Sequence, residues 1–312
     1  MTARRSWRAV LAALALLAPA CGPRLPAAPP ALPRVERVEP TGPGVPPSLA
    51  EASVTFSAPV SPEGLVDGRR MVLVPAAAEH AAVAAVDSDA GAVGVAGAVP
   101  GLVTMEEGGR RAVLKLAAPL HPLVPYALVI SSKLRAADGR AVLDAEGRQR
   151  ATVVSFQTGP AAGPPARPVI AQIRVDAETP EAGGEYVVIQ NRGSGVLDLY
   201  GHRLEKRGPS GGVTSCVLGE GEVAQGNLAL LVGGAYDQRY ALPEGTAVLP
   251  CGSTALLGGL ANDRFPALTL LDPSGAVLST AGAAGGPVCA ILLRTDLDGP
   301  DQPGNWGCVE SD

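Results

Sequence analysis

Three runs of sequence decide the fold, and all lie in the C-terminal half of the chain. They are VIAQIRV (169–175), EYVVIQN (185–191) and LALLV (228–232). Each run is short, rich in β-branched or other apolar residues, and followed by turn-forming residues, which is typical of a buried β-strand. Similar runs, separated by turn signals, follow at TLLD (269–272), AVL (276–278) and AILL (290–293). The C-terminal half is therefore predicted to be all-β.

The N-terminal half repeats this character with six further runs. They are VERVEP (35–40), ASVTFS (52–57), RMVLVP (70–75), RAVLKL (111–116), YALVI (126–130) and ATVVSF (151–156). Glycine (39 residues) and proline (30 residues) exceed average usage, and both disfavour helix interiors. Short strands at this spacing predict β-sandwiches. Residues 76–101 are rich in Ala, Gly and Val without a clear period, and we expect a long irregular loop there.

A Pro-, Gly- and Ala-rich segment, GPAAGPPARP, divides the two halves at residues 159–168. It lacks apolar periodicity, which is typical of a linker. A chain of 312 residues is also long enough for two domains. We therefore predict one β-sandwich over residues 34–158 and a second over residues 169–312.

The first 20 residues are predicted to be an export signal peptide. Three arginines precede an apolar run at 9–18 that is too short to span a membrane. Cys21 follows directly after Ala-Pro-Ala and resembles the lipid-bearing cysteine of bacterial lipoproteins, although Ala18 stands where that family usually has Leu. Ordinary signal peptidase cleavage, which would give a secreted protein, is the alternative. Residues 21–33 are Pro-rich and are predicted to form an extended tether.

Four of the five cysteines lie in the second predicted domain: Cys216, Cys251, Cys289 and Cys308. With Cys21 lipidated, they form an even set, which in an exported protein predicts disulfides. We favour the pairs Cys216–Cys251 and Cys289–Cys308, because the second would tie the C-terminal tail to a strand. A zinc site is the alternative, but it usually needs closely spaced C-x₂₋₄-C pairs, and these spacings are far wider.

Both domains carry motifs of known families. In the first, VTFSAPV (54–60), LHPLVPY (120–126), ADGR (137–140) and SFQTG (155–159) resemble the bacterial Ig-like domain of the SbsA type, which implies a spacer or display module. In the second, EYVVIQN (185–191) and GVLDLYGHRL (195–204) resemble the lamin-tail domain, an Ig-like sandwich. The matched Glu185 and Asn191 flank a strand, and we expect their side chains to serve local backbone hydrogen bonds.

The remaining polar clusters offer little chemistry. Asp296, Asp298 and Asp301 form a weak candidate calcium site, since calcium prefers several carboxylates on a flexible loop, but a solvated turn is the simpler interpretation. A small basic cluster at 202–207 is interrupted by Glu205 and is interpreted as a solvated strand edge. His80 and His121 are interpreted as solvated or hydrogen-bonded residues. No nucleophile elbow, P-loop or HExxH motif is present, so we expect no enzyme.

These observations predict a non-catalytic lipoprotein of the cell envelope, in the outer membrane, since Gly22 rather than Asp follows Cys21 and resembles that sorting pattern. It would act as a surface display, structural or protein-interaction module, with a lipid anchor in the membrane and no cofactor. A net charge of −5 argues against nucleic acid as a partner. The alternatives are a ligand-binding lipoprotein that recognises polysaccharide or an envelope protein, and an accessory subunit of a secreted hydrolase. Few aromatics (3%) leave little surface for stacking sugars.

Overall fold

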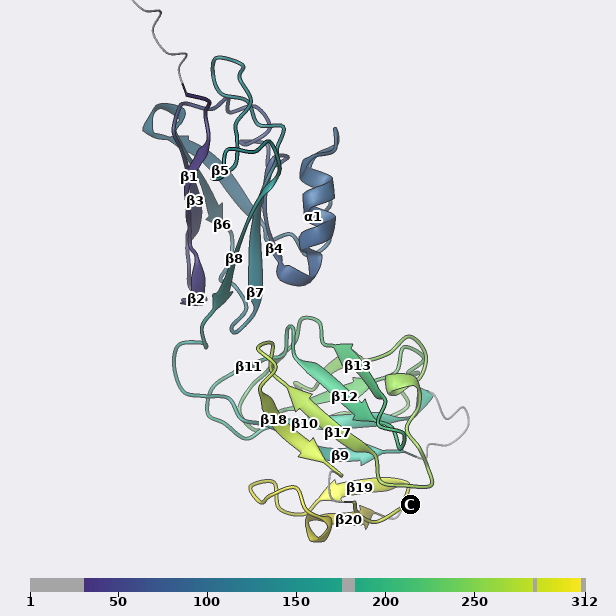
Figure 1. The fold of residues 1–312 in the computed structure, drawn as a ribbon. Helices are drawn as coiled ribbons and strands as arrows, with labels where there is room; N and C mark the ends of the chain where they lie inside the picture. Colours follow the sequence, from purple (N-terminus) through teal and green to yellow (C-terminus); the bar gives the residue numbers. More distant parts are fainter. Residues whose placement is uncertain (1–30, 176–182, 283–284, 310–312) are drawn as a thin grey trace, which may run out of the picture. The chain divides into compact units, whose positions relative to one another are not determined.

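The computed structural model describes residues 31–175, 183–282 and 285–309. The predicted signal peptide and Cys21 therefore lie outside the described residues. Almost all regular structure is β, as the sequence predicted. Strands β1 to β8 pair only with one another, and so do strands β9 to β20, with residues 159–167 between the two groups (Figure 1).

Two four-stranded sheets form the first sandwich. One has the strand order β1-β3-β6-β5 and the other β2-β8-β7-β4. Their bounds are β1 (Val35–Glu39), β2 (Gly42–Val45), β3 (Glu51–Phe56), β4 (Met71–Pro75), β5 (Gly101–Glu106), β6 (Arg111–Leu116), β7 (Pro125–Ile130) and β8 (Thr152–Thr158). Alternate residues of these strands, such as Val54, Leu73 and Leu128, point into a shared core and are fully buried.

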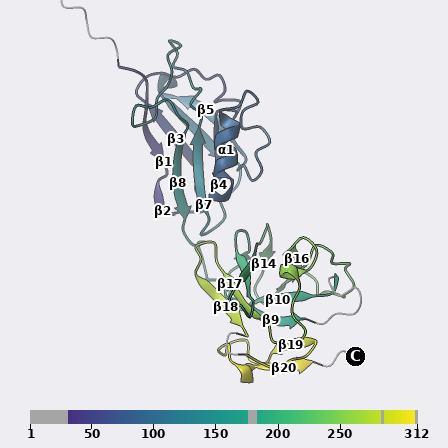
Figure 2. The same ribbon diagram turned by 45° about the vertical axis from the view of Figure 1, so that its right-hand side comes forward.

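The expectation of an irregular loop over residues 76–101 is wrong for its first part. A 3-10 turn, η1 (Ala76–Ala78), leads into a helix, α1 (Glu79–Val86). Alanine is the best helix former, and Ala82 and Val86 are buried against β4 and β7. Figure 1 and Figure 2 both show α1 alongside these strands. The helix covers the outer face of its sheet, which explains why every residue of β4 is buried.

The second sandwich packs a six-stranded sheet, β16-β15-β10-β9-β19-β20, against a four-stranded sheet, β13-β12-β17-β18. A short pair, β11-β14, completes it. The bounds are β9 (Pro168–Arg174), β10 (Tyr186–Asn191), β11 (Leu197–Asp198), β12 (Arg203–Arg207), β13 (Val213–Val217), β14 (Glu222–Val223), β15 (Leu228–Val232), β16 (Ala247–Pro250), β17 (Ala267–Leu271), β18 (Val277–Ala281), β19 (Ile291–Arg294) and β20 (Trp306–Val309).

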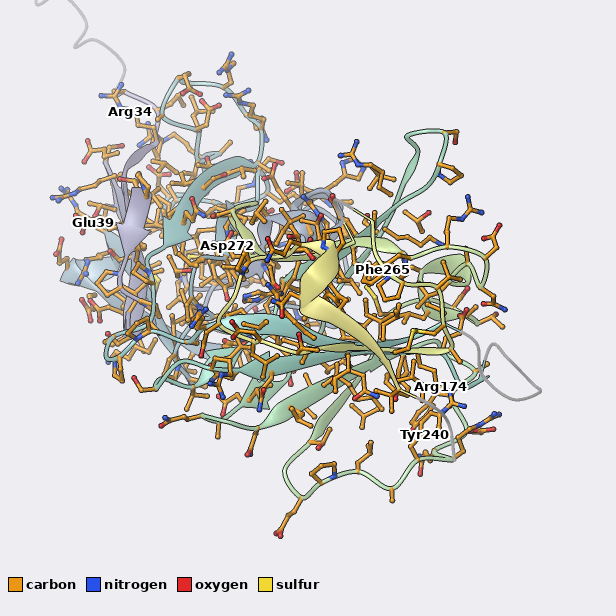
Figure 3. The ribbon with its side chains drawn as sticks, turned by 90° about the horizontal axis from the view of Figure 1, so that it is seen from below. Arg34, Glu39, Arg174, Tyr240, Phe265 and Asp272 are labelled. Atoms are coloured by element: carbon orange, nitrogen blue, oxygen red, sulfur yellow. A yellow bond between two sulfur atoms is a disulfide. The ribbon has the colours of Figure 1, made fainter. Side chains whose placement is uncertain are left out.

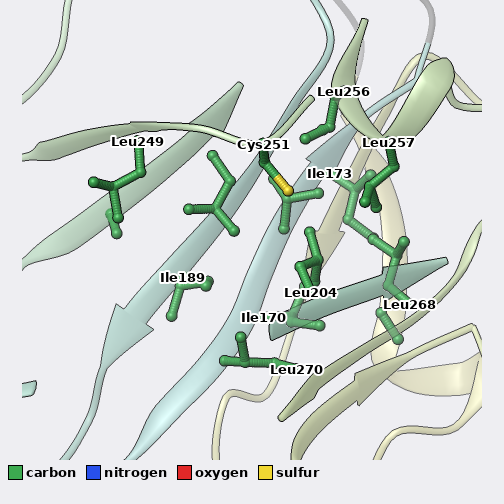
Figure 4. Close-up of a cluster of buried hydrophobic side chains, with 14 of the residues drawn as sticks. Ile170, Ile173, Ile189, Leu204, Leu249, Cys251, Leu256, Leu257, Leu268 and Leu270 are labelled. Atoms are coloured by element: carbon green, nitrogen blue, oxygen red, sulfur yellow. The ribbon is translucent and has the colours of Figure 1, made fainter. Parts of the chain in front are cut away.

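The core of the second sandwich is built almost entirely from aliphatic side chains. Figure 4 shows Ile173, Ile189, Leu204 and Leu270 converging from both sheets, with Cys251 among them. These side chains are at most 1% exposed. At about 1.5–3 kcal/mol for each fully buried aliphatic side chain, this cluster is the main source of the domain's stability.

The connection between β15 and β16 determines the shape of the sheet's outer face. These two strands are parallel, with Leu230 opposite Val248. Parallel neighbours cannot be joined by a tight hairpin, so the chain must cross over. Residues 233–246 make this crossover, and its Tyr236 and Tyr240 pack onto the outer face of the sheet.

Candidate functional site

The four cysteines of the second sandwich form the two predicted disulfides. Cys216 on β13 bonds Cys251, which directly follows β16, with a Cα–Cα distance of 5.4 Å. Because β13 and β16 are edge strands of opposite sheets, this bond ties the two sheets together. Cys289 bonds Cys308 on β20 at 5.9 Å and holds the last strand to the chain before β19. The zinc alternative is therefore wrong.

The three aspartates of the candidate calcium site have other partners. Asp298 accepts hydrogen bonds from the side chains of Arg167 at 2.6 Å and Arg192 at 3.3 Å, and these bonds lower its pKa. Asp301 accepts a hydrogen bond from the indole N–H of Trp306 at 2.9 Å. Asp296 accepts one from the backbone N–H of Asp298. Among the residues that the structure describes, no group of three or more His, Cys, Asp or Glu side chains could hold a metal ion.

Glu185 and Asn191 hold backbone groups in place, as predicted, although not only locally. Asn191 is fully buried and its Oδ1 accepts hydrogen bonds from the backbone N–H groups of Arg167 and Gly193. Its Nδ2 donates to the carbonyls of Gly195 and Val223. The Oε1 atom of Glu185 accepts a bond from the Leu260 N–H at 2.6 Å, from 75 residues along the chain. Both residues are structural anchors.

The interpretation of residues 202–207 as a strand edge is wrong. This segment includes β12, which pairs with β13 on one side and β17 on the other, so it is central in its sheet. His202 is buried, which lowers its pKa. Arg203 pairs with Glu205 at 2.8 Å, and Lys206 donates to the Gly259 carbonyl. Most side chains of this basic cluster are therefore buried or paired within the protein.

The other two histidines fit their interpretation as solvated or hydrogen-bonded residues. His80 is exposed on α1. His121 has its Nδ1 atom 2.7 Å from a carboxylate oxygen of Asp198, and its ring stacks on Tyr200 with the centroids 3.9 Å apart. The hydrogen bond to Asp198 raises the pKa of His121 while burial opposes the rise.

The structure also assembles a groove that the sequence did not indicate. Three of the five tyrosines in the chain, Tyr186, Tyr236 and Tyr240, meet on the outer face of the six-stranded sheet. The rings of Tyr186 and Tyr240 lie edge to face at 5.2 Å. Beside them is a groove of about 350 Å³, whose floor includes Val188 and Leu230. The separation of these tyrosines along the chain hid the cluster from sequence analysis.

One cation stands at the tyrosine end of the groove. The guanidinium carbon of Arg174 lies 5.1 Å from the centre of the Tyr240 ring, and Figure 3 shows the two side chains together. Arg174 is directly opposite Tyr186 in the β9–β10 ladder. Burial raises the pKa of Tyr186 and of Tyr240, and the positive charge of Arg174 opposes both shifts. The tyrosines are therefore neutral hydrogen-bonding and stacking groups at ordinary pH.

Comparisons with known proteins define the class of the molecule only at the level of architecture. No family model and no curated relative matches the chain. The N-terminal part of the bacterial S-layer protein SbsC is 13% identical over 80% of this chain and 42% of its own, with a TM-score of 0.27. The chain thus spans less than half of that structure.

Two other solved structures are similarly distant. The tetra-tandem repeat from the extending region of a large adhesion protein is 10% identical over 80% of this chain and 46% of its own, with a TM-score of 0.25. An L,D-transpeptidase from Mycobacterium smegmatis is 13% identical over 70% of this chain and 89% of its own, with a TM-score of 0.23. At these scores none of the three carries a functional argument. The chain is an all-β protein of β-sandwich domains.

The described ranges 31–175, 183–282 and 285–309 contain the helix α1 and several short 3-10 turns. No helix in these ranges has the length and apolar character needed to cross a bilayer.

Proposed function

We propose that this chain is a non-catalytic lipoprotein of the bacterial cell envelope, held in the outer membrane by a lipid on Cys21. Its two sandwiches would act as a display, structural or protein-interaction module. In this proposal the first sandwich is a bacterial Ig-like spacer and the second a lamin-tail domain, following the motifs that each carries.

The observation that carries the proposal is the pair of disulfides in the second sandwich. Disulfides persist in oxidising compartments and are rare in the cytosol, where thiols are kept reduced. They support export of the chain. The basic and apolar segments of residues 1–20, followed by Cys21 and a Pro-rich stretch, supply a matching export signal and anchor.

Metabolic labelling with a tagged fatty acid tests the anchor. We expect the full chain to incorporate the label and to fractionate with the outer membrane, and Cys21→Ser to lose the label. Pro23→Ala, a neighbouring change that keeps the cysteine, is the matched control and should stay labelled. An unlabelled wild type, or label retained in Cys21→Ser, would refute lipidation and leave a secreted protein.

A second candidate function, ligand binding, is favoured by the tyrosine-lined groove on the second sandwich. Affinity capture from envelope extract with tagged full chain separates the two functions. A protein recovered in stoichiometric amount supports the interaction role, whereas recovery of polysaccharide supports the ligand-binding role.

A further inference from the structure

The outer face of the six-stranded sheet has an unusual composition. In a sandwich this face normally meets water and carries polar side chains. Here Tyr186 and Val188 on β10 and Leu230 and Val232 on β15 are each at most 8% exposed on that face. The crossover of residues 233–246 covers this apolar surface but leaves a space against Val188 and Leu230, and Leu242 at its rim is 36% exposed. What remains open between crossover and sheet is the groove.

The groove has the dimensions and lining of a small-molecule site. Its volume of about 350 Å³ falls at the lower end of the range for ligand pockets, which are mostly apolar with a few polar groups. The aliphatic floor of Val188, Leu228 and Leu230 faces a wall that includes Leu242 and Pro243. An apolar chain or a flat ring can displace water from such a surface without losing hydrogen bonds.

Several polar groups beside the groove already have hydrogen-bond or ion-pair partners. The Gln172 side-chain amide donates to the Tyr186 hydroxyl at 2.6 Å, and the Tyr240 hydroxyl donates to the Gly184 carbonyl at 2.8 Å. Arg239 is neutralised by Asp237 at 2.6 Å. A neutral sugar would therefore find few free partners in the groove, which argues against the ligand that aromatic side chains first suggest.

The Arg174 side chain donates a hydrogen bond to Tyr186, and its positive charge distinguishes it from these groups. Its side chain is partly exposed, and it makes no ion pair with any carboxylate among the described residues. Its Nε atom is buried and has no hydrogen-bond partner among the residues that the structure describes. A guanidinium ion is suited to bind a carboxylate through two parallel hydrogen bonds. The groove thus has an apolar body and, at the tyrosine end, a guanidinium that forms no ion pair with another described residue.

We propose that this groove binds an amphiphilic monoanion, an apolar chain or ring that ends in a carboxylate. The apolar part lies over Val188 and Leu230, and the carboxylate is held by Arg174 beside Tyr186 and Tyr240. This site involves the second sandwich alone, so it stands whether or not Cys21 carries a lipid.

Binding of matched eight-carbon probes to the purified full chain tests the proposal. Octanoate and octan-1-ol share the apolar body and differ in charge, and titration calorimetry or ligand-observed NMR gives both affinities. We expect octanoate to bind about tenfold more tightly than octanol, as charge-assisted hydrogen bonds at a partly exposed site allow. Arg174→Gln should abolish this preference while keeping octanol binding. Leu242→Glu, which places a negative charge at the rim, should weaken octanoate more than octanol.

Arg110→Gln, a change at an exposed arginine of the first sandwich, is the control and should alter neither affinity. Unfolding temperatures of each variant show that the fold is intact. Equal binding of the two probes by the wild type, a preference retained in Arg174→Gln, or tighter binding of methyl glucoside than of octanoate would overturn the proposal. If Arg174→Gln fails to fold, the proposal is still tested by the two affinities of the wild type and by the Leu242→Glu variant.

Discussion

Replacing Asn191 by alanine should strongly destabilise the second sandwich. The side chain lies at the end of β10 and is fully buried. Its four hydrogen bonds, of 2.7 to 3.1 Å, join the linker at Arg167, the turn at Gly193 and Gly195, and the short strand β14 at Val223. Three separate segments therefore depend on one amide group.

The magnitude follows from the number of bonds and their burial. A typical intramolecular hydrogen bond contributes about 1 kcal/mol net, so four bonds give about 4 kcal/mol. The backbone groups that lose Asn191 as their partner would stay buried without hydrogen bonds, so the expected loss of stability remains near this value. Water entering the vacated space offsets part of the loss, which leaves about 3 kcal/mol. For a domain of this size, about 3 kcal/mol corresponds to a fall of roughly 10 °C in Tm.

Urea and thermal unfolding, followed by the fluorescence of Trp306, measure this effect. Trp306 lies in the second sandwich, packed edge to face on Phe265, so its emission reports on this domain. Gln190→Ala is the matched control, because the neighbouring Gln190 makes a single exposed hydrogen bond, to the Gly226 carbonyl, and its loss should cost under about 0.5 kcal/mol. A loss below about 1 kcal/mol in Asn191→Ala, or one equal to that of Gln190→Ala, would refute the reasoning.

Three further predictions concern crosslinks, charge and metal. Removing the Cys216–Cys251 bond by a double serine substitution should cost about 4 kcal/mol, as expected for closing a loop of 35 residues, measured by urea unfolding against the wild type. Burial raises the pKa of Asp144, but hydrogen bonds from two arginines outweigh it and hold the pKa below its usual range. The lowered pKa of Asp144 stabilises the fold at pH values above the pKa that its carboxyl has in the unfolded chain, and this contribution is lost as the pH falls. Asp144→Asn should therefore lower Tm at pH 7, and the difference in Tm from the wild type should shrink progressively below about pH 4. Millimolar calcium should leave the wild-type Tm unchanged, because arginines already hold Asp298; a rise of several degrees would contradict this.

Strand identity was predictable because each strand carries its signal locally. The run 185–191 was predicted to be a strand, and the structure forms β10 (Tyr186–Asn191) there. The even cysteine set in one domain predicted disulfides and allowed three pairings, of which the structure forms the favoured one. In contrast, helix α1 has almost no apolar periodicity, and its identity depends on alanine propensity and on the β4–β7 face that it covers.

The groove was unpredictable for a different reason. Tyr186 and Tyr240 are separated by 54 positions, and they meet only because β16 lies parallel to β15, which forces a crossover over the outer face. Strand pairing of this kind depends on long-range contacts that no local pattern encodes. The same reason explains the error at β12, whose basic residues suggested an edge although the strand is central.

The wall of the groove is fixed at one end by a close backbone approach and at the other by a disulfide. At its start, a side chain at Gly233 or Gly234 would collide with the backbone of Ser253 and Thr254, so only glycine permits the close approach. At its end, β16 runs directly into Cys251, whose disulfide fastens it to the opposite sheet. A crossover held in this way has little freedom to lose when a ligand binds, and such preorganisation favours affinity. The Cys216–Cys251 disulfide, which supports export of the chain, therefore also helps to hold the wall of the groove in which we place the ligand.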